Sequence, residues 1–440
     1  MKLKQLHWEI IVFSLTFLAM VARHSALESW YLAVPKINDH NSMTTVWLAA
    51  CNSGYLFSYA IGNFISGYLE DRYPLRYLIS GALFISSALY CALMTLGFSD
   101  VYIPELFVAH WILQGIFQSA VWPGVVAVMG NWFEGERRGS WMGIWSSCAS
   151  IGDIVGAQFT GLIYIFHGSW MIGLLPFAIF QVVIGLIFIF TIKDSPQQKF
   201  SPEEIKMMTY NEGARESLVD NHKHKKGIPF SKAIVLPGVI AYSLNYACVK
   251  FLYYGLSMWL PYFLDNRIDK KSLTGVLASL LDAGGVFGSV ACGWAGDKLG
   301  FKSIIIVIFL VCSLPLLFLF QLGTESIYWL YFIVIPGAGF FIAGASNIIS
   351  SAIAVDLAQN PDIENKDEAM ATVTGIVDGT GGFGAAVGVL IMGLLSDYSW
   401  LWVFLFMIAT GILAIVCILH IAWRDFRTLR NRRQAIRTSG

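Results

Sequence analysis

The sequence has 440 residues, of which 56% are hydrophobic and 13% are charged, and its mean hydropathy is +0.63. This proportion of apolar side chains exceeds what the interior of a soluble protein can bury, which indicates an integral membrane protein. The 29 basic and 29 acidic residues cancel to a net charge of zero, which argues against nucleic acid as a partner.

Apolar segments of the length needed to cross a bilayer, about 20 residues, follow one another along the chain. About twelve such spans are expected, joined by short polar links. The predicted spans cover 9–35, 44–69, 76–97, 105–130, 139–165, 170–192, 234–264, 272–296, 303–322, 327–356, 368–395 and 400–423. The pattern predicts an all-α membrane protein.

A hydrophilic stretch at 193–232 separates the first six spans from the last six. We therefore expect two six-helix bundles at 1–192 and 233–423, with a cytosolic linker loop at 193–232 and a basic cytosolic tail at 424–440. Most lysine and arginine residues lie in the N-terminus, the linker, the tail and three loops on the same side. By the positive-inside rule, both termini are cytosolic.

Two loops carry the same motif, which indicates an internal repeat of the kind many transporters have. The segment GYLEDRYPLR begins at Gly67, and GWAGDKLGFK begins 226 residues later at Gly293. In each, glycine permits close approach and an acid is followed by bases, which is suited to a latch between helix ends. The alternative is a solvated loop whose charges only set topology. The predicted gating residues are Asp71, Arg72, Arg76, Asp297, Lys298 and Lys302.

These paired loops resemble the signature of the major facilitator superfamily, which implies two pseudo-symmetric six-helix bundles. The stretches FSYAIGNFISGYLEDRYPLRY, WPGVVAVMGNWFEGERRGSWMGIW, YYGLSMWLPYFL and VDGTGGFGAAVG further resemble eukaryotic sugar-phosphate exchangers of the organophosphate:phosphate antiporter family. The resemblance implies exchange of a sugar phosphate or other organic phosphate for inorganic phosphate by alternating access. Because some eukaryotic members lie in the endoplasmic reticulum membrane, the resemblance also implies that location.

Two cations lie inside the apolar spans, where an unpaired charge costs on the order of 3 kcal/mol and is normally functional. Arg23 precedes Pro35 by 12 residues and Lys250 precedes Pro261 by 11, nearly equivalent places in the repeat. Together they suit a dianionic phosphate group. The alternatives are snorkelling to the surface or an ion pair of Arg23 with Glu28. The predicted substrate-binding residues are Arg23, Lys250, His24 and Tyr59, where Lys250 and Tyr59 match the exchangers.

The residues of this chain differ from the family pattern at the expected phosphate site. Leu27 and Tyr253 occupy the positions where bacterial relatives have arginines. Ala149, in the fifth predicted span, occupies the position where they have a histidine. Arg23 and Lys250 each lie one turn away on the same helix face, about 5 Å along the axis. Either the phosphate site has moved by one turn or the substrate has changed.

Acidic residues within the spans can carry protons or pair with buried cations. Glu28 and Asp153 do not match the exchanger pattern, which raises a second hypothesis of a proton-coupled symporter of another organic anion. Asp282 and Asp378 stand beside glycines, where helix packing or hydrogen bonding explains them equally well.

No catalytic or cofactor motif is present, and the seven cysteines are scattered without metal-binding spacing. We expect no enzyme activity, no metal and no cofactor. The expected partners are small anionic solutes, among them organic and inorganic phosphate, and the lipid bilayer. A transport-dead receptor or scaffold is a third hypothesis.

Overall fold

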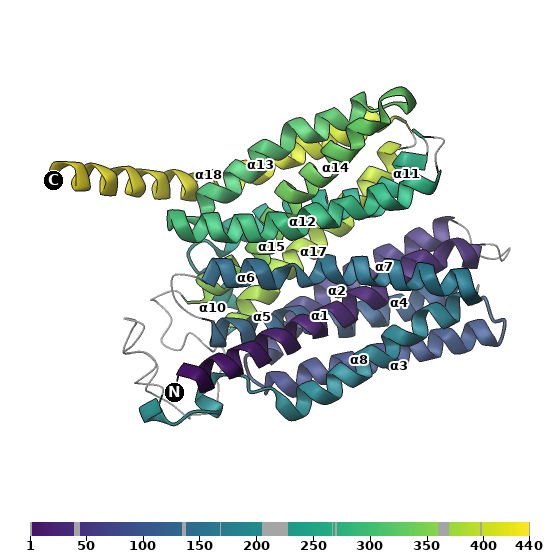
Figure 1. The fold of residues 1–440 in the computed structure, drawn as a ribbon, viewed down its shortest axis with the longest axis horizontal. Coiled ribbons are helices and arrows are strands. Elements are labelled where there is room, and N and C mark those ends of the chain that lie inside the picture. The colour runs from purple at the N-terminus through teal and green to yellow at the C-terminus, as the bar shows by residue number, and fades with distance from the viewer. Residues whose placement is uncertain are drawn as a thin grey trace. The chain divides into compact units, whose positions relative to one another are not determined.

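The computed structural model describes residues 2–38, 45–133, 138–167, 169–204, 228–265, 267–268, 271–359, 369–396 and 398–439 (Figure 1). Within these ranges all regular secondary structure is helical, as the hydropathy pattern predicts. Among the described residues, eight helical stretches are long and apolar enough to cross a bilayer. Packing divides the chain into two compact units. Unit 1 comprises Met1–Gly135, Cys148–Val235 and Val355–Gly379, and unit 2 comprises Glu136–Ser147, Leu236–Ala354 and Thr380–Gly440.

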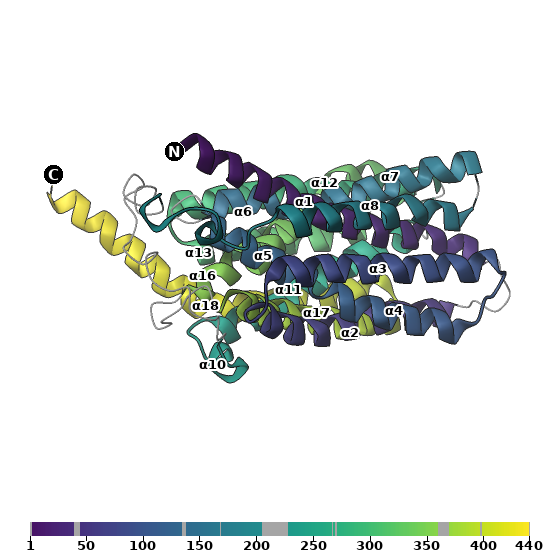
Figure 2. The same cartoon turned by 90° about the horizontal axis from the view of Figure 1, so that it is seen from below.

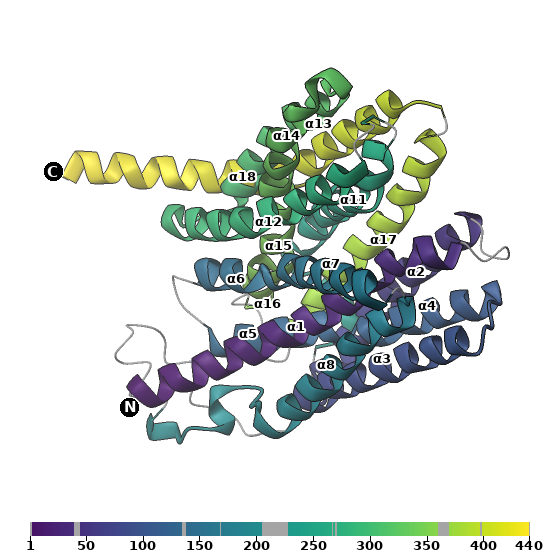
Figure 3. The same ribbon diagram turned by 45° about the vertical axis from the view of Figure 1, so that its right-hand side comes forward.

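Unit 1 contains most of the helices of the first half of the chain. Its elements are α1 (Lys2–Asn38), α2 (Thr45–Glu70), α3 (Leu75–Phe98), α4 (Pro104–Gln118), α5 (Val121–Trp132), α7 (Cys148–His167), α8 (Trp170–Thr191), η1 (Pro196–Gln198), α10 (Phe230–Ile234), most of α16 (Ala354–Ala358) and the start of α17 (Met370–Ser396). Its main helix pairs are α2 with α4, α1 with α7 and α8, and α3 with α8 (Figures 2 and 3).

The predicted span 105–130 is divided into α4 and α5 around Ser119 and Ala120. Pro123 explains the break, because proline has no N–H for the carbonyl four residues earlier and its ring crowds that carbonyl. The carbonyl of Ser119 instead accepts a hydrogen bond from the Ser66 hydroxyl of α2 at 3.3 Å. Neighbouring helices thus satisfy the polar group that the proline releases, as a membrane interior requires.

Unit 2 contains the remaining described elements. They are α6 (Arg138–Ser146), α11 (Val239–Asp265), α12 (Lys271–Leu299), α13 (Lys302–Leu319), η3 (Phe320–Leu322), η4 (Glu325–Leu330), α14 (Tyr331–Ala338), the π-helical turns η5 (Gly339–Ala343) and η6 (Ile349–Ile353), α15 (Gly344–Ile348), the later part of α17 and α18 (Trp400–Ser439). The described part of the predicted tail, 424–439, continues α18 as helix beyond the other helices of its unit (Figure 2).

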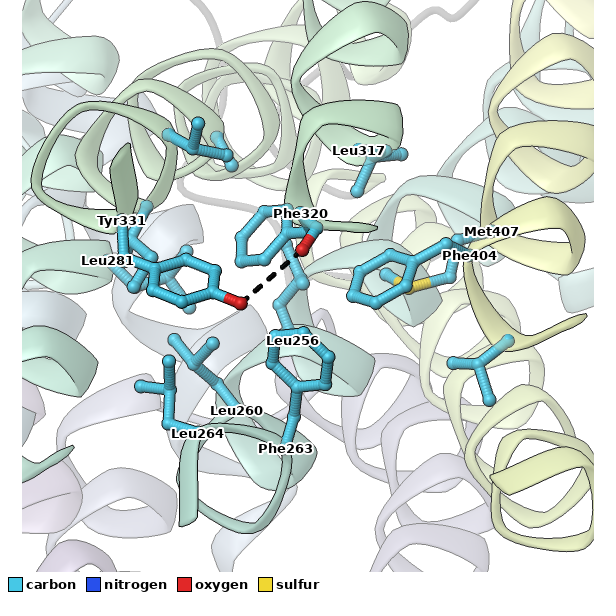
Figure 4. Close-up of a cluster of buried hydrophobic side chains, with 14 of the residues drawn as sticks. Leu256, Leu260, Phe263, Leu264, Leu281, Leu317, Phe320, Tyr331, Phe404 and Met407 are labelled. Carbon is cyan, nitrogen blue, oxygen red and sulfur yellow. Dashed lines mark hydrogen bonds between the residues drawn. The ribbon is translucent and has the colours of Figure 1, made fainter. Parts of the chain in front are cut away.

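A cluster of buried hydrophobic side chains, aliphatic and aromatic, forms the core of unit 2 around the second half of α11 (Figure 4). The ring centroid of Phe263 lies 4.9 Å from that of Trp400 and 5.3 Å from that of Phe404, edge to face. Tyr331 is also buried, and its hydroxyl donates to the carbonyl of Gly323 at 2.9 Å. These contacts tie α11, α14 and α18 together.

Outward-facing apolar residues on α8 form one stripe along the helix. They are Leu175, Ile179, Val182, Val183, Leu186, Ile187 and Phe190, all exposed. Their spacing of three and four residues places them on one helix face. In a bilayer, such a face meets lipid rather than water.

Close backbone contact joins α12 to the segment around the first π-helical turn. A Cβ on Gly288 would lie 1.9 Å from the carbonyl oxygen of Phe340, and one on Gly284 would lie 2.1 Å from that of Pro336. Only glycine allows the two backbones to approach so closely.

Replacing Gly288 by Ala is therefore expected to destabilise the protein. The added methyl group meets backbone, which cannot move aside as a flexible side chain would, so we expect a loss of about 1–3 kcal/mol. The measurement is the melting temperature in detergent. Gly81→Ala is the control, because a Cβ there has no neighbouring atom within 4 Å. Equal melting temperatures for the two variants would refute this packing argument.

Candidate functional site

Arg23, a predicted substrate-binding residue, is buried in the middle of α1, where only 3% of its surface is exposed. Its Nη2 donates to the Tyr55 hydroxyl at 2.9 Å, and its guanidinium carbon lies 5.0 Å from the ring centroid of Tyr59. Both tyrosines come from α2. The guanidinium is thus oriented by a hydroxyl acceptor and by an aromatic face that attracts cations.

His24 lies between Arg23 and an acid of α7. Its Nε2 is 3.0 Å from Nη1 of Arg23, and its Nδ1 is 3.1 Å from Oδ1 of Asp153. Glycine brings the two helices together, because a Cβ on Gly152 would lie 2.6 Å from the Cβ of His24. The Ser25 hydroxyl also donates to the carbonyl of Gly152 at 2.9 Å. This contact between α1 and α7 fixes the histidine beside the carboxylate.

Two further hydrogen bonds extend this cluster from α2. The Tyr55 hydroxyl donates to Oε1 of Gln118 on α4 at 3.0 Å. The Tyr59 hydroxyl donates to Oδ2 of Asp378 on α17 at 3.1 Å. We call Arg23, His24, Tyr55, Tyr59, Gln118, Asp153 and Asp378 the α1 polar cluster. It contains a cation, two acids and an imidazole within an apolar helix bundle.

Lys250, the second predicted cation, is 3% exposed on α11 in unit 2. Its Nζ lies 5.4 Å from the ring centroid of Tyr246 and 5.8 Å from that of Tyr254. A Cβ on Gly381 of α17 would lie 3.0 Å from the Cδ of Lys250. The ammonium group is therefore surrounded by aromatic rings, and glycine leaves room for its stem.

The predicted coupling acids have different surroundings. Asp153 and Asp378 belong to the α1 polar cluster, whereas Asp282 accepts a hydrogen bond of 2.6 Å from the Tyr253 hydroxyl in unit 2. Glu28, the alternative ion-pair partner of Arg23, packs close to Gly156 of α7. A Cβ added to Gly156 would lie 3.0 Å from the Cβ of Glu28.

Asp71, a predicted gating residue, caps the beginning of α17. It is 2% exposed, and its two carboxylate oxygens accept hydrogen bonds from the backbone N–H groups of Ala371 at 2.9 Å and Thr372 at 2.7 Å. A Cβ on Gly67 would lie 2.4 Å from the carbonyl oxygen of Ala371. The carboxylate thus neutralises the positive end of a helix from the other half of the sequence.

Asp297 makes the equivalent contact in unit 2, at the beginning of α6. Oδ1 accepts from the backbone N–H of Gly139 at 2.9 Å, and Oδ2 accepts from the backbone N–H and the hydroxyl of Ser140. Lys302 is 3.8 Å from the same carboxylate. A Cβ on Gly293 would lie 2.2 Å from the carbonyl oxygen of Gly139. Both halves of the repeat therefore use glycine and aspartate in the same way.

The remaining basic residues of the two motifs contact groups other than the motif aspartates. Arg72 donates to the carbonyls of Tyr68 at 2.7 Å and Ile228 at 3.1 Å. The guanidinium of Arg76 donates to the Tyr77 hydroxyl at 3.2 Å. Lys298 is exposed, with its Nζ 4.8 Å from the Trp294 ring centroid.

Comparison with known proteins accounts for this paired architecture. Residues 12–364 match the family model of the Major Facilitator Superfamily. The chain belongs to this superfamily. It is 35% identical over 414 residues to "Sugar phosphate exchanger 3" of Mus musculus, a match that covers 89% of this chain and 83% of that protein. It is 30% identical over 416 residues to "Glucose-6-phosphate exchanger SLC37A2" of Xenopus tropicalis, covering 88% and 82%.

Solved structures agree on the fold. The fucose:proton symporter FucP of E. coli has a TM-score of 0.67 and 13% identity, and the match covers 93% of this chain and 98% of that one. A bacterial homologue of the iron transporter ferroportin has a TM-score of 0.66 and 13% identity, covering the same shares. The predicted major-facilitator fold is confirmed. The protein is a multi-pass membrane transporter of this superfamily and not an enzyme.

Several buried polar residues of the protein were not identified from the sequence. Tyr55 and Gln118 both belong to the α1 polar cluster, and the sequence signal for Gln118 is its spacing of four from Gln114 in an apolar helix. Asp194 accepts hydrogen bonds from the backbone N–H groups of Leu75 at 3.1 Å and Arg76 at 3.2 Å, which caps α3. Glu70 is buried, and its carboxylate oxygens have no hydrogen-bond partner among the described residues.

Proposed function

We propose that this transporter exchanges a sugar phosphate or other organic phosphate for inorganic phosphate by alternating access. The observation that carries the proposal is the burial of Arg23 beside Tyr55 and Tyr59 in the apolar interior of unit 1. A buried guanidinium offers several N–H donors in a fixed plane, which suits a phosphate group. The named exchanger relatives at 35% and 30% identity support the same substrate class.

Lys250 supplies the second positive charge in this proposal. It occupies nearly the same repeat position as Arg23 and is equally buried. In this proposal one dianionic phosphate binds to both cations and is carried from one side of the membrane to the other. His24 and Tyr59 complete the proposed substrate site, and Asp71 and Asp297 are its proposed gates.

Exchange in proteoliposomes tests this function. Vesicles loaded with inorganic phosphate are expected to take up labelled glucose 6-phosphate, and empty vesicles are expected to take up little. Matched vesicles without the protein provide the control. Absence of exchange with a broad panel of phosphorylated solutes, from well-folded protein, would contradict the proposal and favour the receptor or scaffold hypothesis.

The second candidate function is a proton-coupled symporter of another organic anion. The contact between His24 and Asp153 favours it, because a buried imidazole beside a carboxylate is suited to binding a proton. Uptake driven by an imposed pH gradient, with no counter-substrate inside the vesicle, would support this function over exchange.

Topology and location form a separate part of the proposal. The excess of lysine and arginine in the terminal segments and the linker supports cytosolic termini. The endoplasmic reticulum is the proposed membrane. Protease protection of terminal epitope tags and fractionation of tagged protein test the two statements.

A further inference from the structure

The contact between Arg23 and His24 sets the protonation state of the imidazole. Arginine has only N–H donors at neutral pH, so the short contact of Nη1 with Nε2 is a hydrogen bond only if Nε2 carries no proton. The proton of the neutral ring is then on Nδ1, where it is donated to Asp153 at 3.1 Å.

Protonation of Nε2 would place two positively charged donors 3.0 Å apart. Arg23 therefore opposes the protonation of His24, whereas Asp153 favours it through the bond to Nδ1. Moving Arg23 away from His24 therefore favours protonation of the histidine, and removing the Asp153 carboxylate opposes it. A ligand that draws the guanidinium away from Nε2 would leave Asp153 as the closest charge.

Charged and polar groups from the helices around α1 complete these surroundings. Within one turn of His24 the helix itself carries Arg23 and Glu28, and α7 carries Asp153. From α8, Gln181 donates to the carbonyl of Ala22 at 3.5 Å, and α5 has no charged residue. The other groups of the α1 polar cluster are Tyr55 and Tyr59 from α2, Gln118 from α4 and Asp378 from α17. The acids among them all favour an imidazolium.

We propose that His24 is a proton-binding site coupled to the binding of an anion at Arg23. A phosphate dianion engages the guanidinium, the bond from Arg23 to Nε2 is lost, and Nε2 takes up one proton from water. The imidazolium is held by Asp153 at Nδ1 and is attracted to the bound dianion. This inference rests on the proposed anion site at Arg23, and it deepens that proposal by adding a proton to the transported or bound species.

Linkage gives the sign of the pH effect. Because anion binding favours the protonated histidine, protonation must favour anion binding by the same factor. Phosphate binding is therefore expected to weaken by up to about tenfold per pH unit over the pH range in which binding is accompanied by proton uptake at His24, with no further effect of this group at higher pH.

The test compares the purified full-length protein with His24→Gln, using inorganic phosphate as the probe. Glutamine accepts a hydrogen bond from Arg23 through its carbonyl oxygen but does not titrate. Calorimetry in buffers of different ionisation enthalpy measures the protons taken up per phosphate bound. Titration of phosphate itself is common to both proteins and cancels in the difference. We expect about one more proton per phosphate for the native chain.

Asp153→Asn is the second variant, and it covers the case in which His24→Gln fails to fold. Loss of the carboxylate is expected to move the pH profile of phosphate binding to lower pH. Phosphate binding with equal proton uptake and parallel pH profiles in the native chain and these variants would overturn the inference alone. No phosphate binding by the native chain would overturn the anion site itself, and the inference with it.

Discussion

Lys250→Ala and Arg23→Ala are each expected to weaken phosphate binding by about 30- to 100-fold. Each variant removes a charge-assisted contact from a buried site, which corresponds to roughly 2–3 kcal/mol. Affinity is measured by calorimetry on purified protein and by exchange in proteoliposomes. Lys199→Ala is the matched control, because that lysine lies in the loop after α8, with its Nζ 4.5 Å from the Trp8 ring centroid.

The effects of the two variants should not add, because one ligand is proposed to bridge both cations. The double variant should bind phosphate little worse than either single variant. Arg23→Lys should restore binding only in part, because an ammonium is a point charge and does not reproduce the planar donors that now engage Tyr55. Full additivity would indicate two independent roles.

The competing account makes Arg23 only a counter-charge for Glu28. Removing both members of a buried ion pair is often neutral, so Arg23→Met combined with Glu28→Gln would then preserve stability and transport. A shared phosphate site predicts that the double variant remains folded but loses affinity. Near-normal phosphate exchange by this variant would exclude the shared site.

Asp71→Asn is expected to lower the turnover rate about tenfold and to change which side of the carrier is accessible. Asparagine keeps the size of the side chain but loses the negative charge that faces the N–H groups of Ala371 and Thr372. If this contact stabilises one conformation, its loss shifts the population toward the other. Labelling of single cysteines on either side of the membrane measures the shift.

A second helix cap in unit 1 provides the control for this variant. Asp194→Asn removes a charge from the beginning of α3, where Leu75 and Arg76 donate to it. That variant should affect stability without changing accessibility, because both partners come from the first half of the chain. Asp297→Asn should reproduce the Asp71→Asn result through α6. If cysteine labelling is the same in all three variants as in the native protein, the charges of the motif serve only to set the membrane topology.

The repeated motif illustrates what sequence reasoning reaches. Gly67, Asp71 and their counterparts Gly293 and Asp297 are identifiable from their spacing, because glycine for close approach and an acid at a helix end have local physical meanings. Their partners are not identifiable in this way. Ala371 lies 300 residues from Asp71, and a backbone N–H carries no side-chain signature.

The α1 polar cluster depends even more on tertiary structure. Arg23 stands out because a charge in an apolar span is conspicuous, and His24 beside it is conspicuous for the same reason. Tyr55 and Gln118 are ordinary residues of membrane helices until the packing of α2 on α4 brings them to the guanidinium.

The sequence by itself determined the class of the protein and identified the repeated motif and the buried cations, because hydropathy and charge are local properties. The tertiary structure alone decided which of these groups meet. Gly152 permits α1 to approach α7 so closely that His24 contacts Asp153, although 129 residues separate them. Packing distances between helices depend on small residues in both partners, and no single segment contains that information.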